Sequence, residues 1–182
     1  SEVEKIKKDI KDLNDDARRR LEEIKRRLEK LLKELEEKHR ELKKELKKLL
    51  DEVRDLVRRE GPREEVLREV KKRLDDVRRE NKKLTDEVRE ILKKLEEEMK
   101  RILEELERRH RELKKRLDEE PVDDRLREDA ERVLRESKKN LDELEKDVRR
   151  VIKRIEDEAR RLNEDLKRML ERIKRELEKL EK

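Results

Sequence analysis

Residues 21–50 read LEEIKRRLEKLLKELEEKHRELKKELKKLL, and one spacing governs the whole run. Apolar residues return at alternating steps of three and four, as in Leu21, Ile24 and Leu28. This spacing places them on one face of an α-helix, while Lys, Arg and Glu fill the other faces. No glycine or proline interrupts the run. We therefore predict a long amphipathic helix.

The apolar pattern repeats every 18 residues, so that Leu21, position 39 and Val57 share one helical phase. An 18-residue repeat is five turns of about 3.6 residues. A seven-residue repeat would impose a left-handed supercoil, and an 11-residue repeat a right-handed one. The 18-residue repeat therefore predicts nearly straight helices. Paired apolar residues such as Leu31-Leu32 widen the stripe, which favours packing against two neighbouring helices.

Glycine and proline divide the chain into three segments of nearly equal length. The one glycine is Gly61, and the two prolines are Pro62 and Pro121. Because the connections are too short to cross a bundle, adjacent helices must run antiparallel. The helices are predicted at residues 2–60, 62–119 and 122–181.

These observations predict an all-α protein. The expected fold is a single elongated, up-down-up, antiparallel three-helix bundle with nearly straight helices of about 60 residues, each about 90 Å long at roughly 1.5 Å per residue. One domain is expected to span residues 1–182.

The composition excludes several classes of protein. Of the 182 residues 64% are charged and 29% apolar, none is aromatic or a cysteine, and the net charge is +5. Without cysteine there is no disulfide or thiolate metal site. Acids interleave with bases and no aromatic can stack on a base, so we expect no nucleic-acid partner. No apolar run is long enough to span a membrane, and residues 1–5 do not begin a signal peptide. No targeting signal fixes a localisation; we expect a soluble protein, cytoplasmic on recombinant expression.

The regular pattern resembles that of computationally designed, parametric helical bundles. The resemblance covers the whole chain and depends on the equal helices, the 18-residue repeat, the Gly61-Pro62 punctuation and a surface of Lys, Arg and Glu. It implies a protein built for fold and stability, without evolved activity. A natural spectrin-like or apolipoprotein-like bundle would be expected to contain aromatic residues, glutamine and irregular spacing.

A few neutral polar residues break the pattern. Six of them occupy positions at which the 18-residue repeat elsewhere places an apolar residue; His39, for example, shares its phase with Leu21 and Val57. Folding the helices back about residues 61 and 120 gathers the polar residues at two levels. We predict two buried hydrogen-bond networks that fix the register of the helices. They are His39–Asn81–Thr85, with Asn163, and Asn14–His110–Ser137, with Asn140.

Two other interpretations of the histidines stay open. Each ring could lie half-exposed at the edge of the apolar stripe. Glu36-x-x-His39 and Glu107-x-x-His110 match the Glu-x-x-His of di-iron bundles, but such sites need four helices, and the two histidines would lie about 40 Å apart. We therefore expect no metal, no cofactor and no catalytic residue.

The expected function is that of a designed structural scaffold, monomeric and without a required partner. One alternative is an amphipathic bundle that opens to bind lipid or partner helices, although it lacks the aromatic residues of membrane-surface helices. Another is a pH-responsive bundle that acts through His39 and His110.

Overall fold

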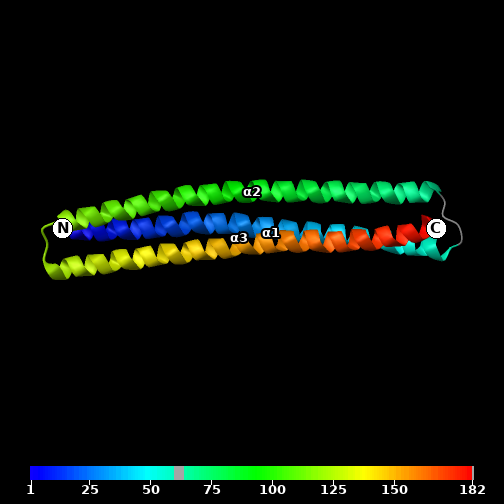
Figure 1. Ribbon diagram of the computed structural model, residues 1–182. Helices are drawn as coiled ribbons and strands as arrows, with labels where there is room; N and C mark the ends of the chain where they lie inside the picture. Colours follow the sequence, from blue (N-terminus) through cyan, green and yellow to red (C-terminus); the bar gives the residue numbers. More distant parts are fainter. Residues whose placement is uncertain (60–63, 182) are drawn as a thin grey trace. The chain divides into compact units, whose positions relative to one another are not determined.

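The computed structural model of the protein describes residues 1–59 and 64–181. In these ranges the chain forms three long helices and no strand (Figure 1). The helices are α1 (Glu2–Arg58, 57 residues), α2 (Glu64–Glu119, 56 residues) and α3 (Asp124–Glu181, 58 residues). The prediction of an all-α three-helix bundle is confirmed.

The helix ends lie within two residues of the predicted ones. At the start of α1, the Glu4 amide donates a hydrogen bond to Ser1 Oγ, at 3.3 Å. Helix α3 begins at Asp124 because the carbonyl of Asp123 accepts the first helical hydrogen bond, from Arg127 N at 3.1 Å. The predicted break at Gly61-Pro62 lies outside the described residues.

The helical chain falls into two compact units. Unit 1 comprises residues 1–29 and 92–153, and unit 2 comprises residues 30–91 and 154–182. Each unit contains a stretch of all three helices. The expectation of a single domain over residues 1–182 stays a prediction.

The core of unit 1 is aliphatic. The stripe of α1 supplies side chains that are at most 1% exposed, and α2 and α3 pack their own stripes against it. The buried side chains include Ile6, Ile10, Leu13, Leu21, Ile24 and Leu28 of α1, Leu106 and Leu117 of α2, and Leu134 and Val148 of α3.

Unit 2 has a core of the same kind. Its buried side chains include Leu35, Leu46 and Leu49 of α1, Val70 and Val77 of α2, and Ile155, Leu162 and Ile173 of α3. At about 25 cal/mol per Å² of apolar surface removed from water, such burial is the main stabilising term in a chain without disulfides.

Ion pairs between α1 and α2 define the helix register within each unit. In unit 1, Asp9 pairs with Arg116 at 2.7 Å and Asp16 with Arg109 at 2.6 Å. A step of seven residues forward along α1 thus corresponds to seven residues backward along α2, as antiparallel packing requires. Unit 2 has the equivalent pair Glu52–Arg73, at 2.7 Å.

The alignment of α1 with α2 that the sequence predicts differs from the observed side-chain pairing by about three residues. Folding back about residue 61 places Arg109 level with position 13, whereas its partner is Asp16. The reason is that side chains on a helix lean toward its N-terminus. On antiparallel helices they lean in opposite directions, so each contact joins residues farther along both helices than a simple reflection gives.

Candidate functional site

Polar side chains within the apolar stripes form the candidate site. His39, His110 and Ser137 are buried, with exposed fractions of 7%, 1% and 5%. These values exclude the interpretation that the histidine rings lie half-exposed at the edge of the stripe. The remaining predicted site residues are half-buried: Asn14, Asn81, Thr85, Asn140 and Asn163.

His110 joins α2 to α3 inside unit 1. Its Nδ1 lies 3.0 Å from the carbonyl oxygen of Leu106, and its Nε2 lies 3.0 Å from Ser137 Oγ. A carbonyl oxygen can only accept, so Nδ1 carries the proton and donates to it. Nε2 is then the acceptor, and the Ser137 hydroxyl donates to it. The ring is held as one neutral tautomer with both nitrogens satisfied.

Burial is the main influence on the charge of His110. Loss of hydration lowers the pKa of the imidazole below its usual value. The hydrogen bond to the Leu106 carbonyl acts in the opposite direction, and the positive charges of Lys138 and Arg109 add to the lowering. The neutral ring is therefore favoured by its surroundings as well as by its hydrogen bonds.

Inside unit 2, His39 of α1 lies against two acidic side chains of α3. Its Nδ1 donates to Glu158 Oε1 at 2.9 Å, and its Nε2 lies 3.4 Å from Asp165 Oδ2 without forming a hydrogen bond. Lys43 Nζ lies 3.2 Å from the same Asp165 oxygen. Although burial raises the pKa of Asp165, Lys43 and His39 together lower it below its usual value. The carboxylate therefore stays ionised beside the ring.

The predicted partners of His39 differ from the observed ones. The sequence pattern grouped it with Asn81 and Thr85, whereas the hydrogen bond that the structure assigns to its ring goes to Glu158. Thr85 Oγ1 instead donates to the carbonyl of Asn81, one turn back on its own helix, at 2.9 Å. The observed pairing of α1 with α2 brings Thr85 no farther from the level of His39; the partners differ because the Thr85 hydroxyl bonds within α2 and the His39 ring bonds to α3.

Two pairs of asparagines link helices. In unit 1, Asn140 Nδ2 donates to Asn14 Oδ1 at 3.2 Å, which joins α3 to α1. In unit 2, Asn81 Nδ2 donates to Asn163 Oδ1 at 3.3 Å, which joins α2 to α3. Every predicted site residue thus makes a hydrogen bond. In unit 2, Thr85, Asn81 and Asn163 are connected through Asn81, whereas His39 bonds separately to Glu158. In unit 1, His110–Ser137 and Asn14–Asn140 are two separate pairs. Two continuous networks, each of four residues, stay a prediction.

The sequence pattern did not predict the two acids that lie beside the His39 ring. Glu158 and Asp165 belong to residue types that make up a large part of the chain, so their identity carries little information. One signal was present: Glu158 has the same helical phase as Asn140, 18 residues earlier, which marks both as residues at the edge of the α3 stripe.

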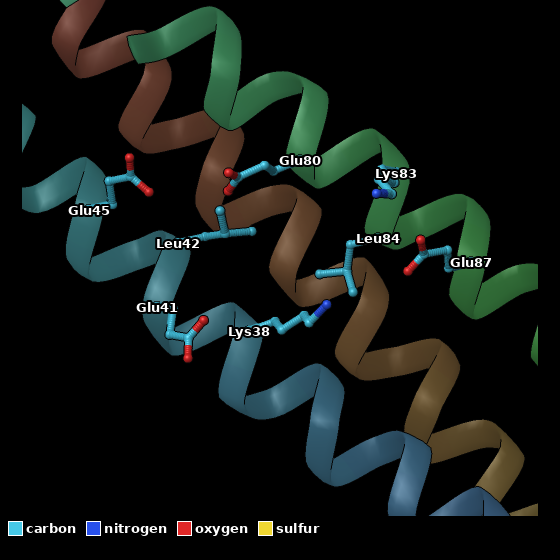
Figure 2. Close-up of a pocket in the computed structure, with 8 residues that line it drawn as sticks. All are labelled: Lys38, Glu41, Leu42, Glu45, Glu80, Lys83, Leu84 and Glu87. Atoms are coloured by element: carbon cyan, nitrogen blue, oxygen red, sulfur yellow. The ribbon is translucent and has the colours of Figure 1, made fainter.

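The grooves between helices are shallow and charged. In unit 2 a groove of about 280 Å³ lies between α1 and α2. Figure 2 shows Leu42 of α1 and Leu84 of α2 facing each other across it. Both leucines are buried. The remaining lining is charged: Lys38, Glu41, Glu45, Glu80, Lys83 and Glu87.

The described residues contain neither a cluster of side chains suited to a metal ion nor a helix suited to span a membrane. Across residues 1–59 and 64–181, no group of three or more His, Cys, Asp or Glu side chains is arranged to hold a metal ion. Within those same ranges, none of the helices has a stretch apolar enough, over a sufficient length, to cross a bilayer.

Comparisons with known proteins agree with the fold. No protein-family model matches the sequence, and no curated protein matches it. A solved structure described as a computationally designed three-helix bundle is similar, with a TM-score of 0.60 and 23% sequence identity. The similarity covers 98% of this chain and 92% of that one. The protein therefore has the fold of a three-helix bundle.

Proposed function

We propose that this protein is a computationally designed structural scaffold, a monomer of one domain, without evolved biochemical activity. The sequence supports this through its 18-residue repeat and its lack of aromatic residues and cysteine. The similarity to a designed three-helix bundle over nearly the whole chain agrees with it.

The contact between His110 and Ser137 is the observation that carries the proposal. Both side chains lie in a core that is otherwise aliphatic, and each occupies a position at which the repeat elsewhere places Leu or Ile. A uniform aliphatic core tolerates helix rotation and sliding, whereas a buried polar group loses roughly 1–3 kcal/mol if it loses its partner. The pair therefore serves to select one packing arrangement.

The same pair does not serve as a catalytic nucleophile and base. A serine hydroxyl that donates to a histidine is the arrangement found in hydrolases. Here Ser137 and His110 are 5% and 1% exposed, so a substrate cannot reach them. The orienting group on Nδ1 is the Leu106 carbonyl, from the same helix, rather than a carboxylate.

Replacing the polar residues with aliphatic ones tests the proposal. One variant changes the unit 1 residues to Leu or Ile, and a matched variant changes those of unit 2. The unit 1 residues are Asn14, His110, Ser137 and Asn140; those of unit 2 are His39, Asn81, Thr85 and Asn163.

We expect both variants to stay helical and to resist denaturant as well as the parent, because well-packed aliphatic residues replace buried polar pairs at little cost. We also expect each variant to adopt more than one packing arrangement of its helices. This would appear as several sets of amide peaks in heteronuclear NMR spectra or as oligomers in light scattering. A monomer with one peak set in both variants would contradict the role in specificity.

Vesicle binding tests the alternative of a bundle that opens on lipid. The scaffold proposal predicts that the protein does not co-sediment with anionic phosphatidylserine vesicles and that its helix content is unchanged by them. Strong co-sedimentation at physiological salt would favour the lipid-binding alternative instead.

A further inference from the structure

The two buried histidines have different groups at their ring nitrogens: a carbonyl and a hydroxyl at His110, and two carboxylates at His39. We propose that they are unlike acid-sensitive elements: protonation of His110 opens the α2–α3 contact of unit 1, whereas the carboxylates around His39 keep the α1–α3 contact of unit 2 closed over the same pH range. This inference goes beyond the scaffold proposal and does not depend on the protein having been designed.

Charged residues of both signs surround His110. On its own helix Arg109 and Arg111 lie nearby, with Glu107 as the opposing charge. From α3 come Lys138 and Asp142. Asp16 of α1 is bound to Arg109 at 2.6 Å.

Among the residues that the structure describes, the hydrogen-bond partners of the two ring nitrogens of His110 are the Leu106 carbonyl and the Ser137 hydroxyl, and neither is a carboxylate. A proton added to Nε2 would turn that atom from acceptor to donor and force the Ser137 hydroxyl to reverse. The resulting charge would be buried without a counter-charge in contact, which is strongly unfavourable. Separation of α2 from α3 would relieve it by admitting water.

His39 has acids in contact with it. Glu158 Oε1 lies 2.9 Å from Nδ1 and Asp165 Oδ2 lies 3.4 Å from Nε2, both from α3. Cations balance these acids: Lys43 of α1 lies 3.2 Å from Asp165, and Arg161 of α3 lies 3.6 Å from Glu158. From α2, the charged residues of the neighbouring groove are Glu80, Lys83 and Glu87.

Each ring nitrogen of His39 has a carboxylate oxygen beside it, whereas those of His110 face a carbonyl and a hydroxyl. A hydrogen bond to a charged group is about twice as strong as one between neutral groups. The α1–α3 contact of unit 2 therefore depends on a carboxylate, whereas the α2–α3 contact of unit 1 depends on the neutral His110–Ser137 pair.

The direction of the pH effect follows from the lowered pKa of His110. In the unfolded chain a histidine binds its proton at about pH 6.5. The folded ring binds it only at lower pH, so the opened state takes up a proton that the closed state does not. Stability around His110 is complete above about pH 6.5 and is lost as the pH falls through the folded pKa, by up to about tenfold in the opening equilibrium per pH unit.

Amide hydrogen exchange on the full-length protein tests the proposal. Protection factors, corrected for intrinsic exchange, are measured by NMR between pH 7.5 and pH 5.0. We expect protection of the amides around His110 and Ser137 to fall by up to about tenfold per pH unit below about 6.5. Protection around His39 and Glu158 should change less than twofold.

Two matched variants identify the responsible ring. His110→Leu should abolish the fall in unit 1, and His39→Leu should leave it intact; leucine occupies phase-equivalent positions 92 and 21. An equal fall in both units, or a fall that persists in His110→Leu, would overturn the proposal. If a variant fails to fold, the unmodified protein provides a second test. An NMR titration midpoint of the His110 ring at or above pH 6.5 would also overturn the proposal.

Discussion

Ser137 Oγ donates a hydrogen bond to His110 Nε2 across 3.0 Å and thereby joins α3 to α2 inside an aliphatic core. The contact is buried and satisfies the Nε2 atom of His110 in this tautomer. Its contribution to the free energy of unfolding can be measured directly, because an exposed residue next to Ser137 provides a control.

Ser137→Ala should lower the free energy of unfolding by about 1–3 kcal/mol, since it leaves His110 Nε2 buried without a donor. Guanidinium unfolding followed by circular dichroism measures the change. Glu136→Ala, at an exposed position on the same helix, should stay within about 0.5 kcal/mol of the parent. Equal effects of the two substitutions would mean that the hydroxyl contributes nothing beyond helix propensity.

The asparagine pair of unit 1 should behave as a coupled unit. A double-mutant cycle with Asn14→Ala and Asn140→Ala should give a coupling energy of about 0.5–1.5 kcal/mol, the usual net value of a neutral hydrogen bond. Strict additivity of the two substitutions would show that the half-buried amides exchange this bond for water without loss.

Two aliphatic positions of unit 2 differ in burial, and alanine substitutions there should differ in their effect on the free energy of unfolding. Leu46 is fully buried, so Leu46→Ala should cost about 2–5 kcal/mol of unfolding free energy. Ile91 is 43% exposed, and Ile91→Ala should change stability by much less. Equally large losses at both positions would mean that the side chain of Ile91 is covered in solution.

The ion pairs of Asp16 should make stability depend on acid. Burial alone would raise the pKa of this carboxyl, but its hydrogen bonds to Arg109 and Arg19 lower it below the ordinary value of 3.8. A lowered folded pKa gives stability that is present above pH 3.8 and is lost as the pH falls through the folded pKa. Asp16→Asn should therefore reduce stability at pH 6 by about 1 kcal/mol, and its difference from the parent should shrink as the pH falls below 3.8.

Urea melts at low salt measure this effect, since guanidinium would screen the charges. A difference between Asp16→Asn and the parent that is equally large at pH 2 and pH 6 would assign the effect to packing rather than to charge.

The helices themselves could be predicted because local rules determine them. The apolar spacing of residues 21–50 admits only a helix, and the prolines mark where helices can begin. Burial of the histidines also follows from phase, since His39 and His110 occupy positions that carry Leu or Val elsewhere in the repeat.

The partners of His39 could not be predicted, for two physical reasons. The first is competition for partners: Thr85 lies near the level of His39, but its hydroxyl donates to the Asn81 carbonyl of its own helix, and the ring bonds to α3 instead. The second is composition. Glu158 differs from dozens of surface acids only by its helical phase. The sequence alone therefore does not identify it as the carboxylate that binds the ring.

The central claim is that buried polar side chains make specific contacts that select one packing of the helices. Nitrogen chemical shifts of the His110 ring at pH 7.5, from long-range proton–nitrogen correlation spectra, test it most directly. The account predicts a protonated Nδ1, bound to the Leu106 carbonyl, and an unprotonated Nε2 that accepts from Ser137. A ring protonated on Nε2, or one that averages between tautomers, would contradict it.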